Sequence, residues 1–103
     1  MLELYQAEWC PHSHRVRMRM TELGVSAVLH PVPAAPEERS ALAAASGQTE
    51  IPTLITEDGA ISGTDAVLAH LDAHFPDGSR VEEHRAKAAE EAGTWEWPAP
   101  AGG

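Results

Sequence analysis

The sequence predicts an α/β fold in which a mixed four-stranded sheet carries helices on both faces. Strand-like and helix-like segments follow one another in the order βαβαββα over residues 1–76. The first three segments fit within residues 1–32, which predicts a parallel βαβ unit with a right-handed crossover. Asp58-Gly59 is a turn signal between the last two strands, so these two strands are expected to pair as an antiparallel hairpin.

The predicted elements are strand 1–6, helix 11–23, strand 26–32, helix 36–45, strand 51–56, strand 60–62 and helix 64–75. The first helix is ambiguous, because residues 16–20 also alternate with the period of a strand. Pro11 at the start, good helix formers inside and Gly24 as the end cap favour a helix. The last helix has Thr64 as its expected N-cap and an apolar stripe that begins at Val67.

The chain after residues 1–76 is expected to be an appendage of this domain. Residues 77–92 are predicted to add one C-terminal helix, in which Ser79 and Glu82 have the spacing of a capping box. Its apolar face is thin, so weak packing is expected. Residues 93–103 are predicted to form a flexible tail, whose two tryptophans either pack on the same chain or contact a partner.

Composition and charge argue against several classes of function. The 103 residues are 43% hydrophobic and 22% charged, which is typical of a soluble domain. The formal net charge of −9 argues against a nucleic-acid partner, because phosphate binding needs clustered Lys and Arg. The sequence has no apolar run of the roughly 20 residues that cross a membrane, and no signal-peptide pattern at its start. We therefore expect a cytoplasmic protein without a membrane partner.

The single cysteine, Cys10, lies where the first strand passes into the first helix. Unpaired N–H groups and the helix dipole favour the thiolate there, and such a motif is typical of an exposed, reactive thiol. Without a second cysteine, oxidation gives a mixed disulfide with an external thiol, and Ser13 is placed to hydrogen-bond the thiolate. The alternative is a buried, inert cysteine. The following Arg15, Arg17 and Arg19 either attract an anionic ligand or form a solvated helix face.

Three separated motifs carry a family resemblance: Cys10-Pro11-His12-Ser13, Glu50-Ile51-Pro52 and Gly63-Thr64-Asp65. In this order and spacing they resemble the glutaredoxins and, equally, the N-terminal domains of glutathione transferases, both of which have the thioredoxin fold. The resemblance covers residues 1–76. The first motif is similar to the monothiol form of the glutaredoxin motif.

The resemblance implies a role for each motif. The implied catalytic residues are Cys10, Pro11 and Ser13, and the implied ligand-binding residues are His12, Glu50, Ile51, Pro52, Gly63, Thr64 and Asp65. In both families the proline of the second motif is cis, and the preceding residue pairs through its backbone with the cysteinyl part of glutathione. The third motif receives the γ-glutamyl group at a helix N-terminus. The implied co-substrate is glutathione or another low-molecular-weight thiol.

Some residues depart from the family pattern. Glu8 is near the position where glutaredoxins commonly carry Lys or Arg, and its charge opposes both a thiolate and an anionic ligand. His12 replaces the usual aromatic residue, either as a proton donor or as a polar substitute, and Ser62 replaces a glycine. The first motif also differs from the Cys-Gly-Phe-Ser of cluster-carrying glutaredoxins, which argues against an iron–sulfur cluster. Two sets of residues are candidate metal ligands, Cys10-His12-His14 and His70-His74, but their helical spacing does not bring three ligands together, so no metal site is predicted.

The leading prediction is a monothiol glutaredoxin-like thiol–disulfide oxidoreductase that acts on glutathione mixed disulfides through Cys10. Its expected partners are a thiol-containing small molecule and glutathionylated proteins. One alternative is an N-terminal domain of the glutathione transferase type with a cysteine-type site. The C-terminal helix then begins a second, all-helical domain, and the chain is expected to be too short to complete it. Another alternative is a non-catalytic binding module of the thioredoxin fold.

Overall fold

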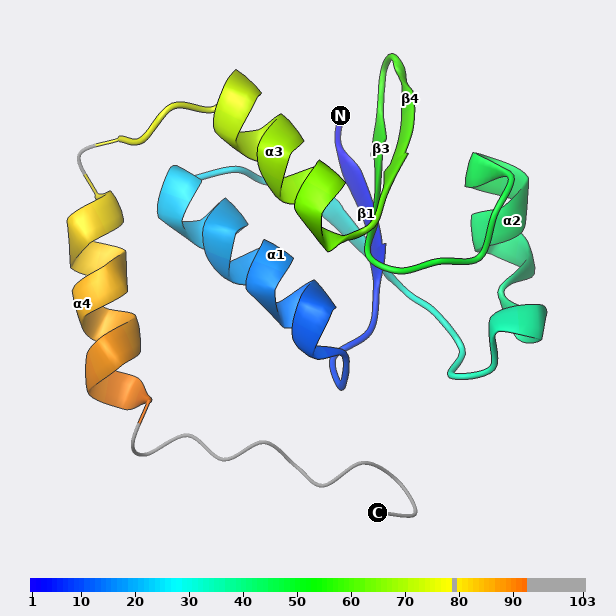
Figure 1. Ribbon diagram of the computed structural model, residues 1–103, viewed down its shortest axis with the longest axis horizontal. Helices are drawn as coiled ribbons and strands as arrows, with labels where there is room; N and C mark the ends of the chain where they lie inside the picture. Colours follow the sequence, from blue (N-terminus) through cyan, green and yellow to red (C-terminus); the bar gives the residue numbers. More distant parts are fainter. Residues whose placement is uncertain (79, 93–103) are drawn as a thin grey trace.

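Four short strands form one mixed sheet in the order β2-β1-β3-β4 in the computed structural model, which describes residues 1–78 and 80–92 (Figure 1). The elements are β1 (Glu3–Gln6), α1 (Pro11–Leu23), β2 (Val28–Pro31), the 3-10 turn η1 (Pro36–Glu38), α2 (Ser40–Ser46), β3 (Thr53–Thr56), β4 (Gly59–Ser62), α3 (Thr64–His74) and α4 (Val81–Glu91). The order βαβαββα is confirmed.

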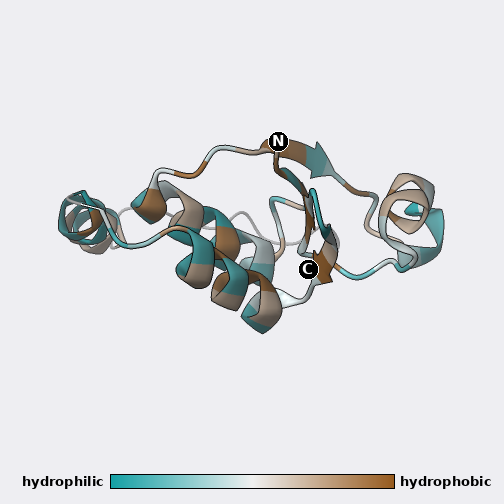
Figure 2. Cartoon of the chain, turned by 90° about the horizontal axis from the view of Figure 1, so that it is seen from above, coloured by the Kyte–Doolittle hydropathy of each residue, from teal (hydrophilic) through white to brown (hydrophobic). Residues whose placement is uncertain are grey.

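Strand β1 is an inner strand that pairs with β2 on one side and with β3 on the other. Leu4 lies opposite Leu29 in the parallel pair with β2, and opposite Leu54 in the antiparallel pair with β3. β3 and β4 form the expected hairpin, in which Thr56 lies opposite Gly59. Helices α1 and α3 cover one face and α2 covers the other, as Figure 2 shows from above. This is the predicted thioredoxin-like arrangement.

The core lies between the sheet and the pair of helices α1 and α3. Its buried members are Leu4, Val16, Met20, Leu54, Val67 and Leu71. Val16 and Met20 are four residues apart on α1, so helical spacing, and not the alternation of the sequence, decides which side chains are buried. Gly24 ends α1 with a φ of 70°, as expected for a C-terminal cap.

The strands predicted at 1–6 and 26–32 begin two residues later than expected, at Glu3 and Val28, and three further boundaries are wrong. The helix predicted at 36–45 is divided at Arg39, whose backbone is not helical (φ −86°, ψ 57°) because its side chain binds carbonyl groups on either side of α2. The strand predicted from residue 51 begins at Thr53, since Pro52 has no N–H for a sheet. Thr64 is the first residue of α3 and not its cap; Gly63 is the N-cap, with no side-chain hydrogen bond.

The predicted C-terminal helix exists as α4 and packs beside α1 (Figure 1). Of its described residues, Val81 alone is buried, in agreement with a thin apolar face. The ion pair between Arg85 and Glu22 of α1 adds a polar contact at 3.3 Å. The predicted capping box needs Ser79, which lies outside the described residues, as does the tail 93–103. None of the described helices combines the length and apolar character that a membrane crossing requires.

Candidate functional site

Cys10 is the N-cap of α1, directly after the turn that follows β1. Its Sγ accepts the backbone N–H of Ser13 at 3.5 Å, and its carbonyl accepts the N–H of His14 at 3.0 Å. Pro11 occupies the first helical turn. The thiol therefore lies where the sequence places it, at the N-terminus of α1.

The sequence predicts an exposed thiol, but the Cys10 residue is only 6% exposed in the structure. The physical reason is the capping geometry: a side chain that accepts from Ser13 folds back onto the first turn instead of projecting into solvent. Pro11 and His12, which follow it, are exposed.

Ser13 is fully buried and contacts the sulfur through its backbone. Its hydroxyl oxygen accepts the N–H of Ala7 at 3.3 Å, which closes the turn between β1 and α1. The hydrogen bond from hydroxyl to thiolate that the sequence suggested is thus replaced by one from the main chain. The observed role of Ser13 is to hold Cys10 at the helix start.

The second and third motifs meet beside this helix start. The peptide bond between Ile51 and Pro52 is cis, as the resemblance implied, and the Pro52 carbonyl accepts the N–H of Gly63 at 3.0 Å. A cleft of about 460 Å³ opens over this junction. Its described lining residues are His12, Arg15, Glu50, Ile51, Ser62, Gly63, Thr64, Asp65 and Ala66. All three motifs contribute to the site, but four of the predicted site residues do not line the cleft, namely Cys10, Pro11, Ser13 and Pro52.

A partly buried network of hydrogen bonds supports the wall of the cleft and has no signature in the sequence. The Thr53 hydroxyl donates to the Glu50 carbonyl at 2.6 Å and lies 3.0 Å from the Ser62 hydroxyl. The Gln48 amide donates to Thr53 at 3.0 Å. Arg39 donates to the neighbouring Thr49 carbonyl at 2.9 Å. These side chains join the cis-proline loop to β4 and α2, and they belong to residue types that are equally common on surfaces.

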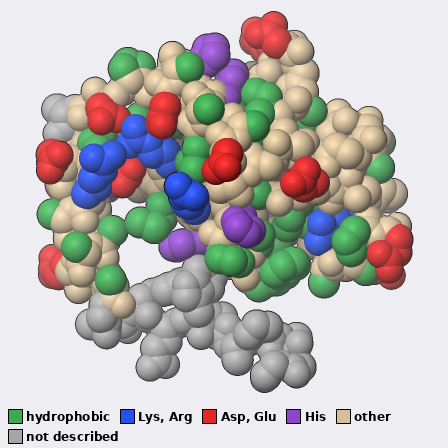
Figure 3. Space-filling view, in the orientation of Figure 1, with side chains coloured by type: hydrophobic (Ala, Val, Ile, Leu, Met, Phe, Trp, Pro, Cys, Tyr) green, Lys and Arg blue, Asp and Glu red, His purple; other side chains and the backbone are tan. Residues whose placement is uncertain are grey.

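The three arginines of α1 have different surroundings. Arg17 donates to Gln6 and lies 3.7 Å from Glu8. Arg19 bonds to Asp72, Asp77 and Glu22 at 2.7–3.0 Å, and its hydrogen bond with Asp72 is the largest influence that raises its pKa. In Figure 3 the blue side chains over α1 lie among red carboxylates. Arg15 instead lines the cleft.

Two titratable residues near Cys10 also have particular surroundings. Burial lowers the pKa of His14 below its ordinary 6.5, Arg17 lowers it further, and Glu8 opposes both. Glu8 is largely exposed and paired with Arg17, which reduces the influence of its charge on a ligand. Among the described residues, no three side chains of the metal-ligating types gather into a group.

The structure defines the class of protein as a thioredoxin-fold domain with one helix-capping cysteine and a cleft at its cis-proline loop. A model of the N-terminal domain of glutathione S-transferases matches residues 4–83, and the chain belongs to this family. Comparison with curated protein sequences gives no match.

Solved structures of transferases have the same fold. A diazinon-metabolizing glutathione S-transferase of the silkworm Bombyx mori is 29% identical (TM-score 0.64), and the alignment covers 74% of this chain and 39% of that one. The Omega 3C transferase of Trametes versicolor is 17% identical (TM-score 0.66), and the alignment covers 86% of this chain and 42% of that one. A transferase homologue from Sulfitobacter, solved with bound glutathione, is 22% identical (TM-score 0.63). This alignment covers 89% of this chain and 49% of that one. The chain thus spans less than half the length of these proteins.

Proposed function

We propose that this chain is the glutathione-binding domain of a cysteine-type glutathione transferase, in which Cys10 exchanges disulfides with glutathione. The observation that carries the proposal is the junction of the motifs. The Gly63 N–H bonds to the Pro52 carbonyl, and one cleft is lined by residues of all three motifs. The family match supports the transferase alternative of the sequence analysis better than the glutaredoxin interpretation.

The cleft offers complementary groups along its length. In the proposal, the backbone of Ile51 pairs with the cysteinyl part of glutathione, and the start of α3 at Thr64 receives the γ-glutamyl carboxylate. The exposed Asp65 carboxylate faces the ammonium group of the same residue. His12 lies on the opposite wall, at the first turn of α1. The glutathione bound in the Sulfitobacter homologue supports this choice of thiol.

The proposed chemistry is two successive thiol–disulfide exchanges. The Cys10 thiolate attacks the glutathione sulfur of a mixed disulfide, a new sulfur–sulfur bond forms, and the partner leaves as a thiolate that takes a proton from water. A second glutathione thiolate then attacks the Cys10–glutathione disulfide and releases glutathione disulfide. The sum converts one mixed disulfide and one glutathione into one thiol and one glutathione disulfide. Glutathionylated proteins are the proposed partners, in a reducing compartment such as the cytoplasm.

The test combines intact mass spectrometry with a turnover assay on the full chain. After incubation with glutathione disulfide we expect an adduct of one glutathionyl group on the wild type and none on Cys10→Ser. With hydroxyethyl disulfide and glutathione, turnover is expected for the wild type alone. Glutathione binding, measured by calorimetry, is the matched control, because Cys10 does not line the cleft and the variant is expected to bind.

Two outcomes contradict the proposal in different ways. A wild-type chain that binds glutathione but neither forms the adduct nor turns over faster than Cys10→Ser is a binding module. In that case the Cys10 thiol, which is 6% exposed, does not react with the bound ligand. A wild-type chain that does not bind glutathione refutes the assignment of the cleft itself.

A further inference from the structure

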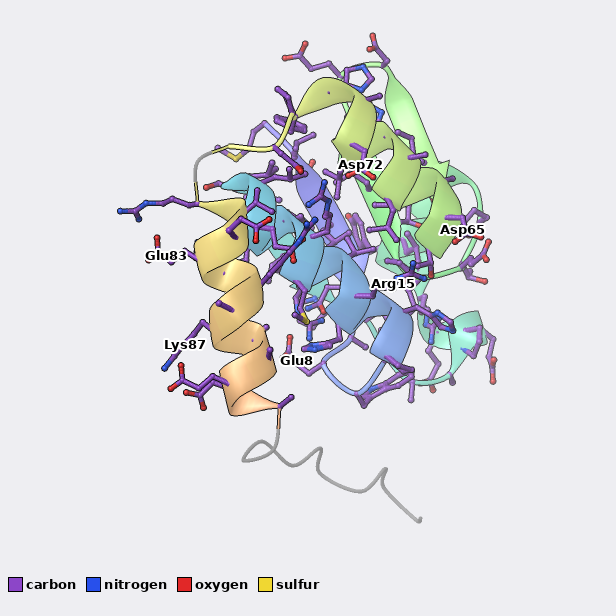
Figure 4. All side chains as sticks on the ribbon, turned by 60° about the vertical axis from the view of Figure 1, so that its left-hand side comes forward. Glu8, Arg15, Asp65, Asp72, Glu83 and Lys87 are labelled. Carbon is purple, nitrogen blue, oxygen red and sulfur yellow. The ribbon has the colours of Figure 1, made fainter. Side chains whose placement is uncertain are left out.

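The last turns of α3 carry two histidines that lie against each other. The rings of His70 and His74 stack with their centroids 4.1 Å apart and an angle of 23° between their planes. Residues four apart share one face of a helix, which explains this contact. His74 is exposed and His70 is partly buried, so the pair lies at the surface. In Figure 4, Asp72 marks this part of α3, and Asp65 marks the start of the helix beside the cleft.

One hydrogen bond determines the protonation of the His74 ring. Its Nδ1 lies 3.0 Å from the carbonyl oxygen of His70. A carbonyl oxygen can only accept, so Nδ1 carries the proton and Nε2 of the neutral ring carries the lone pair. Histidines that bind metals commonly donate their other ring N–H to a backbone carbonyl in this way. The His74 ring is thus oriented with Nε2 available to a metal ion.

The His70 ring is able to turn towards the same metal ion. Within the described part of the chain, its ring nitrogens form no hydrogen bond that would resist rotation. Metal–nitrogen bonds of about 2.0–2.1 Å place two adjacent ligand nitrogens about 2.9–3.4 Å apart. Since the ring centroids are 4.1 Å apart, rotation of His70 about its side-chain torsions brings one of its nitrogens to this separation from Nε2 of His74.

The charges around the pair favour a cation. His74 is the last residue of α3, and the C-terminal end of a helix carries partial negative charge on its unpaired carbonyl groups. The chain has a formal net charge of −9, which attracts cations in general. Asp72 is bonded to Arg19 at 2.8 Å, and no third ligating side chain of the described residues joins the two histidines. The protein therefore supplies two nitrogen ligands and leaves the other positions to water.

We propose that His70 and His74 form a two-histidine chelate for a divalent transition-metal ion such as Ni²⁺, Cu²⁺ or Zn²⁺. Imidazole nitrogens suit these ions, whereas Mg²⁺ and Ca²⁺ take oxygen ligands. Both ligands belong to one helix and already lie in contact, so little conformational freedom is lost when the metal binds. The site is near the end of α3 remote from the cleft, and the proposal does not depend on the reaction of Cys10.

The test titrates Ni²⁺ into four full-length proteins by calorimetry, because this ion binds imidazole and does not oxidise the Cys10 thiol. The proteins are the wild type, His70→Gln, His74→Gln and, as the matched control, His84→Gln, which replaces a partly buried histidine of α4. We expect one saturable site in the wild type and in His84→Gln. Binding should be at least about tenfold weaker in the other two variants, since even losing a group that only orients a ligand costs about 10–100-fold. Mg²⁺ should show no such site, which separates chelation from attraction to the negative charge.

The NMR spectrum of the wild-type imidazole protons provides a second measurement. A small amount of paramagnetic Ni²⁺ should broaden the signals of His70 and His74 before those of the other histidines. This measurement needs no variant, so it tests the site even where a substitution weakens the fold. The proposal is overturned by a wild type without saturable Ni²⁺ binding, by either single variant binding as tightly as the wild type, by an equal loss in His84→Gln, or by broadening that begins at other histidines.

Discussion

Replacing Arg39 by methionine is expected to destabilise the domain strongly, although the residue lies outside every motif. Arg39 is 7% exposed, and its guanidinium donates to the carbonyl oxygens of Pro33, Thr49 and Ala34 at 2.8, 2.9 and 3.0 Å. These bonds connect the chain before α2 with the chain after it. The variant keeps most of the apolar stem but leaves three carbonyls without their donor.

The magnitude follows from these three bonds. A hydrogen bond to a charged group contributes about 1.5–3 kcal/mol, so three contribute at most about 4.5–9 kcal/mol. The variant also removes the cost of burying a guanidinium, which is several kcal/mol and of opposite sign. We therefore expect the free energy of unfolding to fall by about 3 kcal/mol, a large part of the roughly 5–15 kcal/mol that is typical of a domain.

Urea unfolding followed by far-UV circular dichroism measures this loss. For a domain of this size it corresponds to a fall in Tm of about 12–24 °C. Arg80→Met is the control, because Arg80 is exposed and its replacement should change the free energy of unfolding by less than about 0.5 kcal/mol. A loss below about 1 kcal/mol for Arg39→Met would refute the assignment of Arg39 as the connection between these segments.

Two further predictions concern titration and ion pairing. Because the pKa of His14 is lowered in the folded state, the unfolded chain takes up this proton first, so stability falls as the pH drops below 6.5 and levels off once the folded pKa is passed. His14→Gln should reduce the difference between urea midpoints at about pH 7.5 and about pH 5.5, and an unchanged difference would assign it to other groups. Arg19→Leu should lower the free energy of unfolding by about 1–2 kcal/mol, after allowance for the half-exposed Asp72 and Asp77. This loss should shrink in about 1 M salt, and a loss independent of salt would argue for packing instead of charge.

The fold was predictable where the residues of one segment themselves determine its helix ends or its turn. The helix α1 forms at Pro11–Leu23 and ends at Gly24 as expected, because an N-terminal proline and an end-capping glycine act on their own backbone. The hairpin between β3 and β4 follows from Asp58-Gly59 for the same reason. The order of elements then restricts the topology to few choices.

Predictions failed where a distant group took part. Arg39 lies inside the helix predicted at 36–45. Its side chain donates hydrogen bonds to carbonyls of the loops before and after α2, and the predicted helix is divided at this residue. Gly63 replaces Thr64 as the cap of α3, and its N–H bonds to Pro52 of the adjacent loop. The carbonyls that Arg39 contacts lie five to ten residues from it, and Pro52 lies eleven residues before Gly63, so these contacts extend beyond the spacing of one helical turn.

The sequence by itself determined the element order, the position of Cys10 at a helix start and the three motifs of the candidate site. These are properties of neighbouring residues, and local chemistry is sufficient to specify them. Only the tertiary structure decided that Cys10 is folded back and 6% exposed, and that the cis-proline loop bonds to the start of α3. It also decided which arginines of α1 pair with carboxylates of this chain, namely Arg17 and Arg19. Burial and pairing depend on groups that folding brings together from distant parts of the chain.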